Sequence, residues 1–318
     1  MNSWAQPLLL LLLLLTALPR TLAQQNESAL LKPGGGGLQA LVDSTVAATL
    51  EKFAGKNLQS TQLAVTCIDL RAADKLAQAS YRGDAPIYPA SVIKLFYLVA
   101  AHRWMADGKL KDTEELRRAM RDMIVDSGND PTHYIVDLLT GTTSGPELPE
   151  EQMKEWADKR NAVNRYFLSV GYKKLNINQK PWCEGPYGRE RIFVGKNYEN
   201  RNALTTEATA RLLAEIVQGR AITAARSHET LKLMERDPFK KIEPSCEPNQ
   251  NVDFTGPALP PGAKLWSKAG WTSTTRHDAA YVELPNGARF VLVTFTTGHA
   301  NEREIIPFVA AKVIAAMK

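Results

Sequence analysis

Short apolar or alternating segments near both ends of the chain have the pattern of β-strands. The last two of these segments are separated by Pro285-Asn286-Gly287, which is a hairpin turn signal. The earlier pair, around residues 62–81, is expected to form a second hairpin. The predicted strands are 62–70, 78–81, 264–268, 278–284 and 289–296.

Between these segments, apolar residues recur with the spacing of helices. The predicted helices are 91–105, 113–125, 132–139, 150–169 and 206–218, with one further helix near each end at 38–53 and 303–317. Because strands come from both ends and helices mainly from the middle, we predict an α+β fold. One antiparallel sheet is built from both termini and flanked by helices, beside an all-helical subdomain at about 90–236.

The first residues have the pattern of a secretory signal peptide. An unbroken apolar run, too short to span a bilayer, precedes Thr21-Leu22-Ala23, a plausible small-residue cleavage site. The run is not preceded by Lys or Arg, which departs from the usual pattern. We expect removal of residues 1–23, giving a secreted or periplasmic protein without stable membrane insertion. Residues 24–40, with four consecutive glycines, are expected to be a flexible segment before the domain at 41–318.

Composition narrows the classes of partner and cofactor. With 44% hydrophobic and 23% charged residues and a net charge of +5, the chain has no block dense in Lys or Arg, which argues against nucleic-acid binding. The histidines are scattered, so we expect no metal site or other cofactor, and a monomer. Cys67 lies in an apolar strand and is expected to be buried, whereas Cys183 and Cys246 are the better disulfide pair.

Ser91-Val92-Ile93-Lys94 carries the first candidate chemistry. Pro89 and Ala90 place the serine near a helix N-terminus, where backbone N–H groups favour a developing negative charge. Lys94 follows at i+3, so its amine can reach the hydroxyl of Ser91. A buried lysine that loses its charge can act as the base that activates a serine. The plainer interpretation is an ordinary helix start with a solvated lysine.

Two further elements follow in order along the chain. Ser127-Gly128-Asn129 lies in a polar turn, and Lys268-Ala269-Gly270 leads into strand sequence. Together with Ser91-x-x-Lys94, this order resembles class A β-lactamases and low-molecular-mass penicillin-binding proteins, which carry Ser-x-x-Lys, Ser-Asp-Asn and Lys-Thr-Gly. The resemblance runs from about residue 60 to the C-terminus. Without it, a turn or helix cap and a surface lysine on an edge strand would explain the second and third elements.

The resemblance implies a role for each matching residue. Ser91 is the nucleophile, Lys94 activates it, and Ser127 relays a proton to the leaving nitrogen. The remaining residues bind or orient the substrate. Asn129 forms hydrogen bonds to the substrate and to Lys94, Lys268 attracts an anionic group of the substrate, and Gly270 lets the substrate backbone approach the strand. The backbone N–H groups of Ser91 and Trp271 form the oxyanion hole, and Thr272 contacts the substrate.

The chain departs from the family pattern at several positions. Ala269 replaces a threonine that binds the substrate carboxylate, and Thr272, Ser273 or Arg276 are candidates to replace its hydroxyl. Gly128 replaces a structural aspartate. The glutamate that activates water in class A β-lactamases has no matching motif here. Glu190 is the first candidate and Glu184 the second, but either could be an ion-pairing loop carboxylate instead.

The sequence therefore predicts an exported serine hydrolase that forms an acyl-enzyme on a small-molecule or peptide amide, such as a β-lactam or a wall peptide of peptidoglycan. A β-lactamase and a wall-peptide hydrolase remain equally open. The alternative is a catalytically degenerate domain that binds wall peptides or glycans, which Ala269 and the missing glutamate motif motivate.

Overall fold

Strands from both ends of the chain meet in one seven-stranded sheet in the computed structural model, which describes residues 32–33, 36–72, 76–182, 185–243 and 248–317. The strand order is β1-β3-β2-β7-β6-β5-β4, and all neighbours are antiparallel except β1 and β3. The predicted signal peptide, Cys183, Glu184 and Cys246 lie outside the described residues. The strands are β1 (Lys32–Pro33), β2 (Leu63–Asp69), β3 (Ala77–Tyr81), β4 (Glu235–Arg236), β5 (Lys264–Trp271), β6 (Thr275–Glu283) and β7 (Arg289–Thr297).

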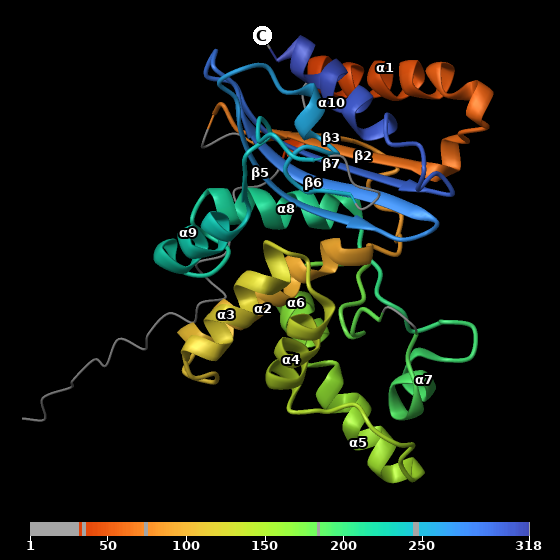
Figure 1. Ribbon diagram of the computed structural model, residues 1–318, viewed down its shortest axis with the longest axis vertical. Helices are drawn as coiled ribbons and strands as arrows, with labels where there is room; N and C mark the ends of the chain where they lie inside the picture. Colours follow the sequence, from red (N-terminus) through yellow and green to blue (C-terminus); the bar gives the residue numbers. More distant parts are fainter. Residues whose placement is uncertain (1–31, 34–35, 73–75, 183–184, 244–247, 318) are drawn as a thin grey trace, which may run out of the picture.

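Helices cover both faces of this sheet (Figure 1). The terminal helices α1 (Gly36–Lys52) and α10 (Ile305–Ala316) pack together on one face, and α8 (Thr206–Val217) packs on the other. Alternating residues of β2 serve the two layers: Val65 and Cys67 belong to the core under α1 and α10, and Ala64 and Ile68 to the core on the opposite side. The predicted α+β class with a sheet from both termini is confirmed.

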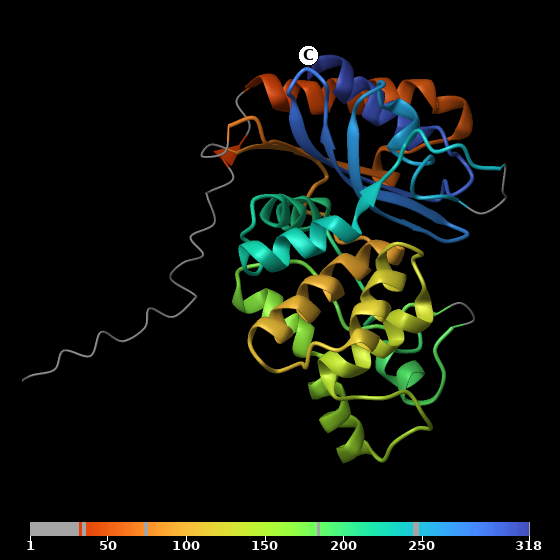
Figure 2. The ribbon, with the colours of Figure 1, turned by 60° about the vertical axis from the view of Figure 1, so that its left-hand side comes forward.

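The remaining helices form a body beside the α8 face of the sheet (Figure 2). Its central helix α2 (Ile93–Ala106) is almost entirely buried. The other members are α3 (Glu114–Ile124), α4 (Asn129–Thr140), α5 (Glu150–Arg160), α6 (Ala162–Ser169), α7 (Gly188–Val194) and α9 (Ala224–Leu233).

Several boundaries differ from the prediction. The segment 150–169 is two helices, α5 and α6, because the chain turns at Asn161. The short helix α7, the helix α9 and the two-residue strands β1 and β4 were not predicted. Helix α1 begins at Gly36, so residues 36–40 of the segment expected to be flexible are helical; a glycine start is tolerated because first-turn N–H groups have no partner inside the helix.

Two expectations about single features can be checked here. Cys67 has no exposed surface and no disulfide partner, and burial raises the pKa of its thiol to about 12, so it is the buried small hydrophobe expected. No helix in the described ranges combines the length and apolar character needed to cross a bilayer.

Candidate active site

Ser91 lies at the boundary between the sheet and the helical body. It occupies a single 3-10 turn, η4 (Ala90–Val92), directly before α2. Ala90 has a left-handed backbone with φ of 47°, a strained conformation for a residue with a Cβ. In this strained turn Ser91 is partly exposed, whereas the neighbouring residues of α2 are buried. Its place at the helix start agrees with the prediction.

Lys94, one turn into α2, contacts both predicted polar residues of the second element. Its side chain has no exposed surface. Its Nζ donates to the Oδ1 of Asn129 at 2.8 Å, lies 3.4 Å from the Oγ of Ser127, and also donates to the backbone oxygen of Ser127. Ser127 sits between α3 and α4 with φ of 57°, again in the left-handed region. The turn is therefore strained at the point where it presents Ser127 to Lys94.

Lys268 approaches Ser127 from the sheet. It lies on β5, and its fully buried Nζ donates to the Oγ of Ser127 at 2.9 Å. The structure thus joins residues 94, 127, 129 and 268 by direct contacts between three separate elements. We call Lys94, Ser127, Asn129, Lys268 and the neighbouring Gln250 the junction cluster.

The amine of Lys268 has an unusual electrostatic environment. Its other hydrogen-bond partners are the backbone oxygen of Ala269 at 2.7 Å and the Oε1 of Gln250 at 2.6 Å, both uncharged. Burial is the main cause that holds the pKa of Lys268 well below its usual range. The nearby charges of Lys94 and Arg236 lower it further, and only Asp278 opposes them. The charged form of this amine therefore loses its proton more readily than a solvent-exposed lysine does.

Gly270 brings β5 against the turn that carries Ser91. A Cβ at this position would lie 2.7 Å from the backbone oxygen of Pro89 and 2.8 Å from the backbone nitrogen of Ser91, so only glycine fits. Trp271 follows directly, half-buried against Phe254, with ring centroids 5.7 Å apart. The two backbone segments expected to form the oxyanion hole are therefore neighbours.

Thr272 and Arg276 are placed by the hairpin between β5 and β6. The Oγ1 of Thr272 contacts the Oγ1 of Thr275 at 3.0 Å and accepts from the backbone N–H of Thr274 and Thr275, so it stabilises the turn. Arg276 is buried with its guanidinium 4.1 Å from the ring centre of Phe254. Substrate contact by either residue stays a prediction.

Two further residues hold this site and were not anticipated from the sequence. Gln250 bonds Lys268, as described above. His277 on β6 contacts the backbone oxygen of Tyr88 at 2.9 Å through Nε2, and its Nδ1 accepts from the backbone N–H of Thr296. Burial lowers the pKa of His277 to about 4, so the imidazole is neutral and fixes the segment that leads into Ser91. His277 pairs with Gly270 across β5 and β6, but both residues lie outside the strands predicted at 264–268 and 278–284, and no local pattern marks Gln250.

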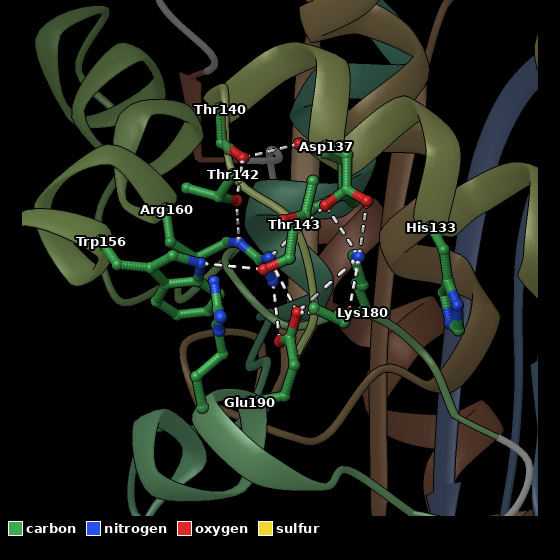
Figure 3. A network of polar contacts seen from close by, with 12 residues as sticks. His133, Asp137, Thr140, Thr142, Thr143, Trp156, Arg160, Lys180 and Glu190 are labelled. Carbon is green, nitrogen blue, oxygen red and sulfur yellow. Dashed lines mark hydrogen bonds and ion pairs between the residues drawn. The ribbon is translucent and has the colours of Figure 1, made fainter. Parts of the chain in front are cut away.

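Glu190 lies in a different group of buried charges, shown in Figure 3. The carboxylate forms two parallel bonds with Arg160, both at 2.8 Å, and accepts from the Oγ of Ser144 at 2.9 Å. Lys180 is 3.7 Å from Glu190 and 2.7 Å from Asp137. We call Asp137, Arg160, Lys180 and Glu190 the loop cluster. Since Glu190 has no exposed surface and binds Arg160 through both oxygens, its geometry favours the ion-pairing alternative over water activation.

The arrangement at the junction suits nucleophilic chemistry by a serine. A hydroxyl at a helix start, two lysine amines and a second hydroxyl are the kinds of group that a nucleophile, a base and a proton relay require. Within the described ranges, no three His, Cys, Asp or Glu side chains cluster as a metal site would require.

Comparisons with known proteins agree with this fold. A family model described as the beta-lactamase enzyme family matches residues 156–316, which include Lys268 and Gly270. The fold is similar to a β-lactamase from Sphaerobacter thermophilus (19% identity, TM-score 0.62, 86% of this chain and 97% of that one). It is also similar to a PBP-A mutant in an acyl-enzyme complex with penicillin G (20%, 0.63, 90% and 98%) and to a β-lactamase from Chitinophaga pinensis (19%, 0.62, 86% and 100%). No curated protein matches the sequence.

Proposed function

Because the chain belongs to the β-lactamase enzyme family, we propose that it is a serine hydrolase that forms an acyl-enzyme through Ser91 on an amide substrate. The observation that carries the proposal is the contact of Lys94 and Lys268 with the same hydroxyl, that of Ser127, at 3.4 and 2.9 Å. These residues come from three separate elements, and a merely structural role would not require two buried amines on one serine.

The proposed reaction uses the residues of this site as follows. The Oγ of Ser91 attacks the carbonyl carbon of the substrate, and its proton moves to a neutral amine of the Lys94–Lys268 pair. The backbone N–H groups of Ser91 and Trp271 stabilise the resulting oxyanion. The carbon–nitrogen bond then breaks, and the leaving nitrogen takes the proton through the hydroxyl of Ser127. Water later cleaves the ester and restores Ser91.

We further propose that the acyl-enzyme is long-lived and that the natural substrate is a peptide of the cell wall rather than a β-lactam antibiotic. The commitment of Glu190 to Arg160 supports this choice, because a buried ion-paired carboxylate is a poor base for water. The pattern of residues 1–23 supports export, and with it a periplasmic or secreted location.

Nitrocefin turnover tests the proposal. We expect a burst of one product per protein molecule followed by slow turnover in the native protein, and no burst in Ser91→Ala. Rapid steady turnover would identify an efficient β-lactamase instead. A full burst in Ser91→Ala would show that another residue is the nucleophile.

A second function, a binding module for wall peptides or glycans, is motivated by Ala269, which lacks the hydroxyl found in the resembling family. It predicts that the protein sediments with insoluble peptidoglycan equally well before and after Ser91→Ala, and that no acyl substrate labels it. Covalent labelling that depends on Ser91 would exclude this function.

A further inference from the structure

We propose that Gln250 is a positioning residue: its uncharged amide holds Lys268 against Ser127, and the use of an amide rather than a carboxylate sets the pH range in which Ser91 is acylated. The inference rests on the proposed function. It concerns a residue outside the three family motifs, in the long connection between β4 and β5.

The side chain of Gln250 is fully occupied. Its Oε1 accepts from the Nζ of Lys268 at 2.6 Å and from the backbone N–H of Ala269 at 3.1 Å. Its Nε2 donates to the backbone oxygens of Ile124 and Val125 at 3.2 and 3.0 Å. With 6% of its surface exposed, it uses both the acceptor and the donor capacity of an amide in a buried place.

These four hydrogen bonds connect the end of α3 with strand β5, the two elements that meet at Ser127. Ile124 is the last residue of α3, and its carbonyl and that of Val125 are helix-end acceptors without a helical partner. Arg236 makes a parallel bridge, since its Nη2 donates to the backbone oxygens of Ile124 and Ser267. Of these two bridging side chains, Gln250 is the one that bonds the amine of Lys268, so it sets where that amine lies relative to the turn carrying Ser127.

The contacts of Lys268 fit a neutral amine as well as a charged one. A neutral amine has two hydrogens and one lone pair. The oxygens of Gln250 and Ala269 can only accept, so they take the two hydrogens, and the lone pair is left for the hydroxyl of Ser127. Such an amine can receive a proton from the serine side of the site.

The charges around Lys268 explain why the amide matters. Lys94 from α2 and Arg236 from β4 oppose its protonation, while Asp278 from β6 favours it. The amines of Lys94 and Lys268 contact the same hydroxyl, and the charge of Lys94 opposes protonation of Lys268. A carboxylate in place of the amide of Gln250 would raise the proton affinity of Lys268, which would then become protonated at a higher pH than in the native protein. Because acylation needs a neutral amine, the rate would begin to fall at that higher pH as the solution is made more acidic.

The experiment measures the rate of labelling by a fluorescent penicillin from pH 5 to 9 in the full-length protein. Gln250→Glu keeps the shape and adds the charge, Gln250→Met removes the hydrogen bonds, and Gln152→Glu makes the same charge change at an exposed position on α5. We expect Gln250→Glu to shift the acid limb of the profile upward by about one to three pH units. Gln250→Met should slow labelling at least about tenfold without that shift. Gln152→Glu should match the native profile.

The outcomes separate this inference from the proposed function. A Gln250→Glu profile that superimposes on that of Gln152→Glu, in a protein that is folded and labelled at Ser91, overturns the inference and leaves the function intact. If Gln250→Glu does not fold, Gln250→Met decides, since an unchanged labelling rate overturns the inference. Absence of Ser91-dependent labelling in the native protein would overturn the proposed function itself.

Discussion

The junction cluster and the loop cluster both bury two cationic side chains, yet they differ in what surrounds those charges. In the loop cluster, Arg160 and Lys180 face two carboxylates, Glu190 and Asp137. In the junction cluster, the amine of Lys268 contacts a hydroxyl, an amide and a backbone oxygen, all uncharged. The first arrangement pairs its cations with carboxylates, whereas in the described part of the chain the hydrogen-bond partners of the Lys268 amine are all uncharged.

The difference separates a structural role from a chemical one. A buried ion pair with matched charges holds elements together, and breaking it leaves an uncompensated charge. A buried amine whose hydrogen-bond partners are all uncharged is costly to protonate, so burial holds the pKa of Lys268 well below its usual range although the charge of Asp278 opposes this shift. Groups with strongly perturbed proton affinity concentrate at functional sites. The comparison therefore supports our proposal that the loop cluster stabilises the fold and the junction cluster is the reactive site.

Substitution of Glu190 by alanine is expected to have the largest effect, and on stability. Removing this carboxylate leaves the buried guanidinium of Arg160 without its bidentate partner. The free energy of unfolding should therefore fall by about 3–5 kcal/mol. Urea unfolding measures the loss, with Glu147→Ala at an exposed position as the control. A native-like stability together with much slower deacylation would instead make Glu190 a catalytic base.

Substitution of Lys268 by methionine is expected to lower the acylation rate and to leave the stability of the fold nearly unchanged. The acylation rate should fall by about 10²–10³-fold, because the substitution removes an amine that transfers protons and stabilises negative charge in the transition state. Stability should change little, since methionine avoids burying an amine with no carboxylate contact. Lys264→Met, exposed on the same strand, is the matched control for both measurements. A rate within a factor of three of the control would remove Lys268 from the mechanism.

His102 extends the comparison to a buried base outside both clusters. Neither ring nitrogen has a hydrogen-bond partner among the described residues, and the carboxylate of Glu229 is 3.8 Å from Nδ1. Burial lowers its pKa from 6.5 to about 4, so between these values the unfolded chain binds the proton more strongly than the folded protein. Stability is therefore lost as pH falls from 6.5 towards 4.

Replacing His102 with leucine should remove part of this acid sensitivity. The variant is expected to keep up to about 3 kcal/mol more of its free energy of unfolding at pH 4 than the native protein does, each relative to its own value at pH 7. Denaturant unfolding at pH 4, 5.5 and 7 measures the difference. If the free energy of unfolding depended on pH in the same way in both proteins, His102 would take up its proton over the same pH range in the folded protein as in the unfolded chain.

Ser144→Ala is the smallest of these changes. Its Oγ donates to Glu190 and accepts from Lys180, both within the loop cluster. Loss of these bonds should lower the free energy of unfolding by about 1–2 kcal/mol and leave the acylation rate unchanged. An acylation rate that falls with stability unchanged would mean that the two clusters are coupled and that their roles cannot be divided as above.

The residues of the junction could be predicted where their signal is local. Ser91 and Lys94 are three positions apart on one helix, and Ser127 with Asn129 forms a recognisable polar turn. Gln250 lies in a connection without periodicity, and its partners Ile124 and Lys268 are 126 and 18 residues away. Contacts at such distances depend on tertiary packing and leave no mark in the neighbouring sequence.

The fold shows the same division between local and distant signals. The five longer strands and most of the longer helices were predicted because many residues repeat their period, whereas α7, with seven residues, and the two-residue strands β1 and β4 are too short to show one. The ten-residue helix α9 was also missed. The fate of Glu190 also depended on packing, because Arg160 lies 30 positions earlier, on a helix whose other charged residues are largely exposed.

The most direct test of the central claim is the site of the covalent bond. The native protein is treated with penicillin, digested, and sequenced by tandem mass spectrometry. The account predicts one penicilloyl group per chain, attached to Ser91. Attachment to Ser127 or to a lysine, or an unmodified protein under conditions that label a penicillin-binding protein, would contradict it.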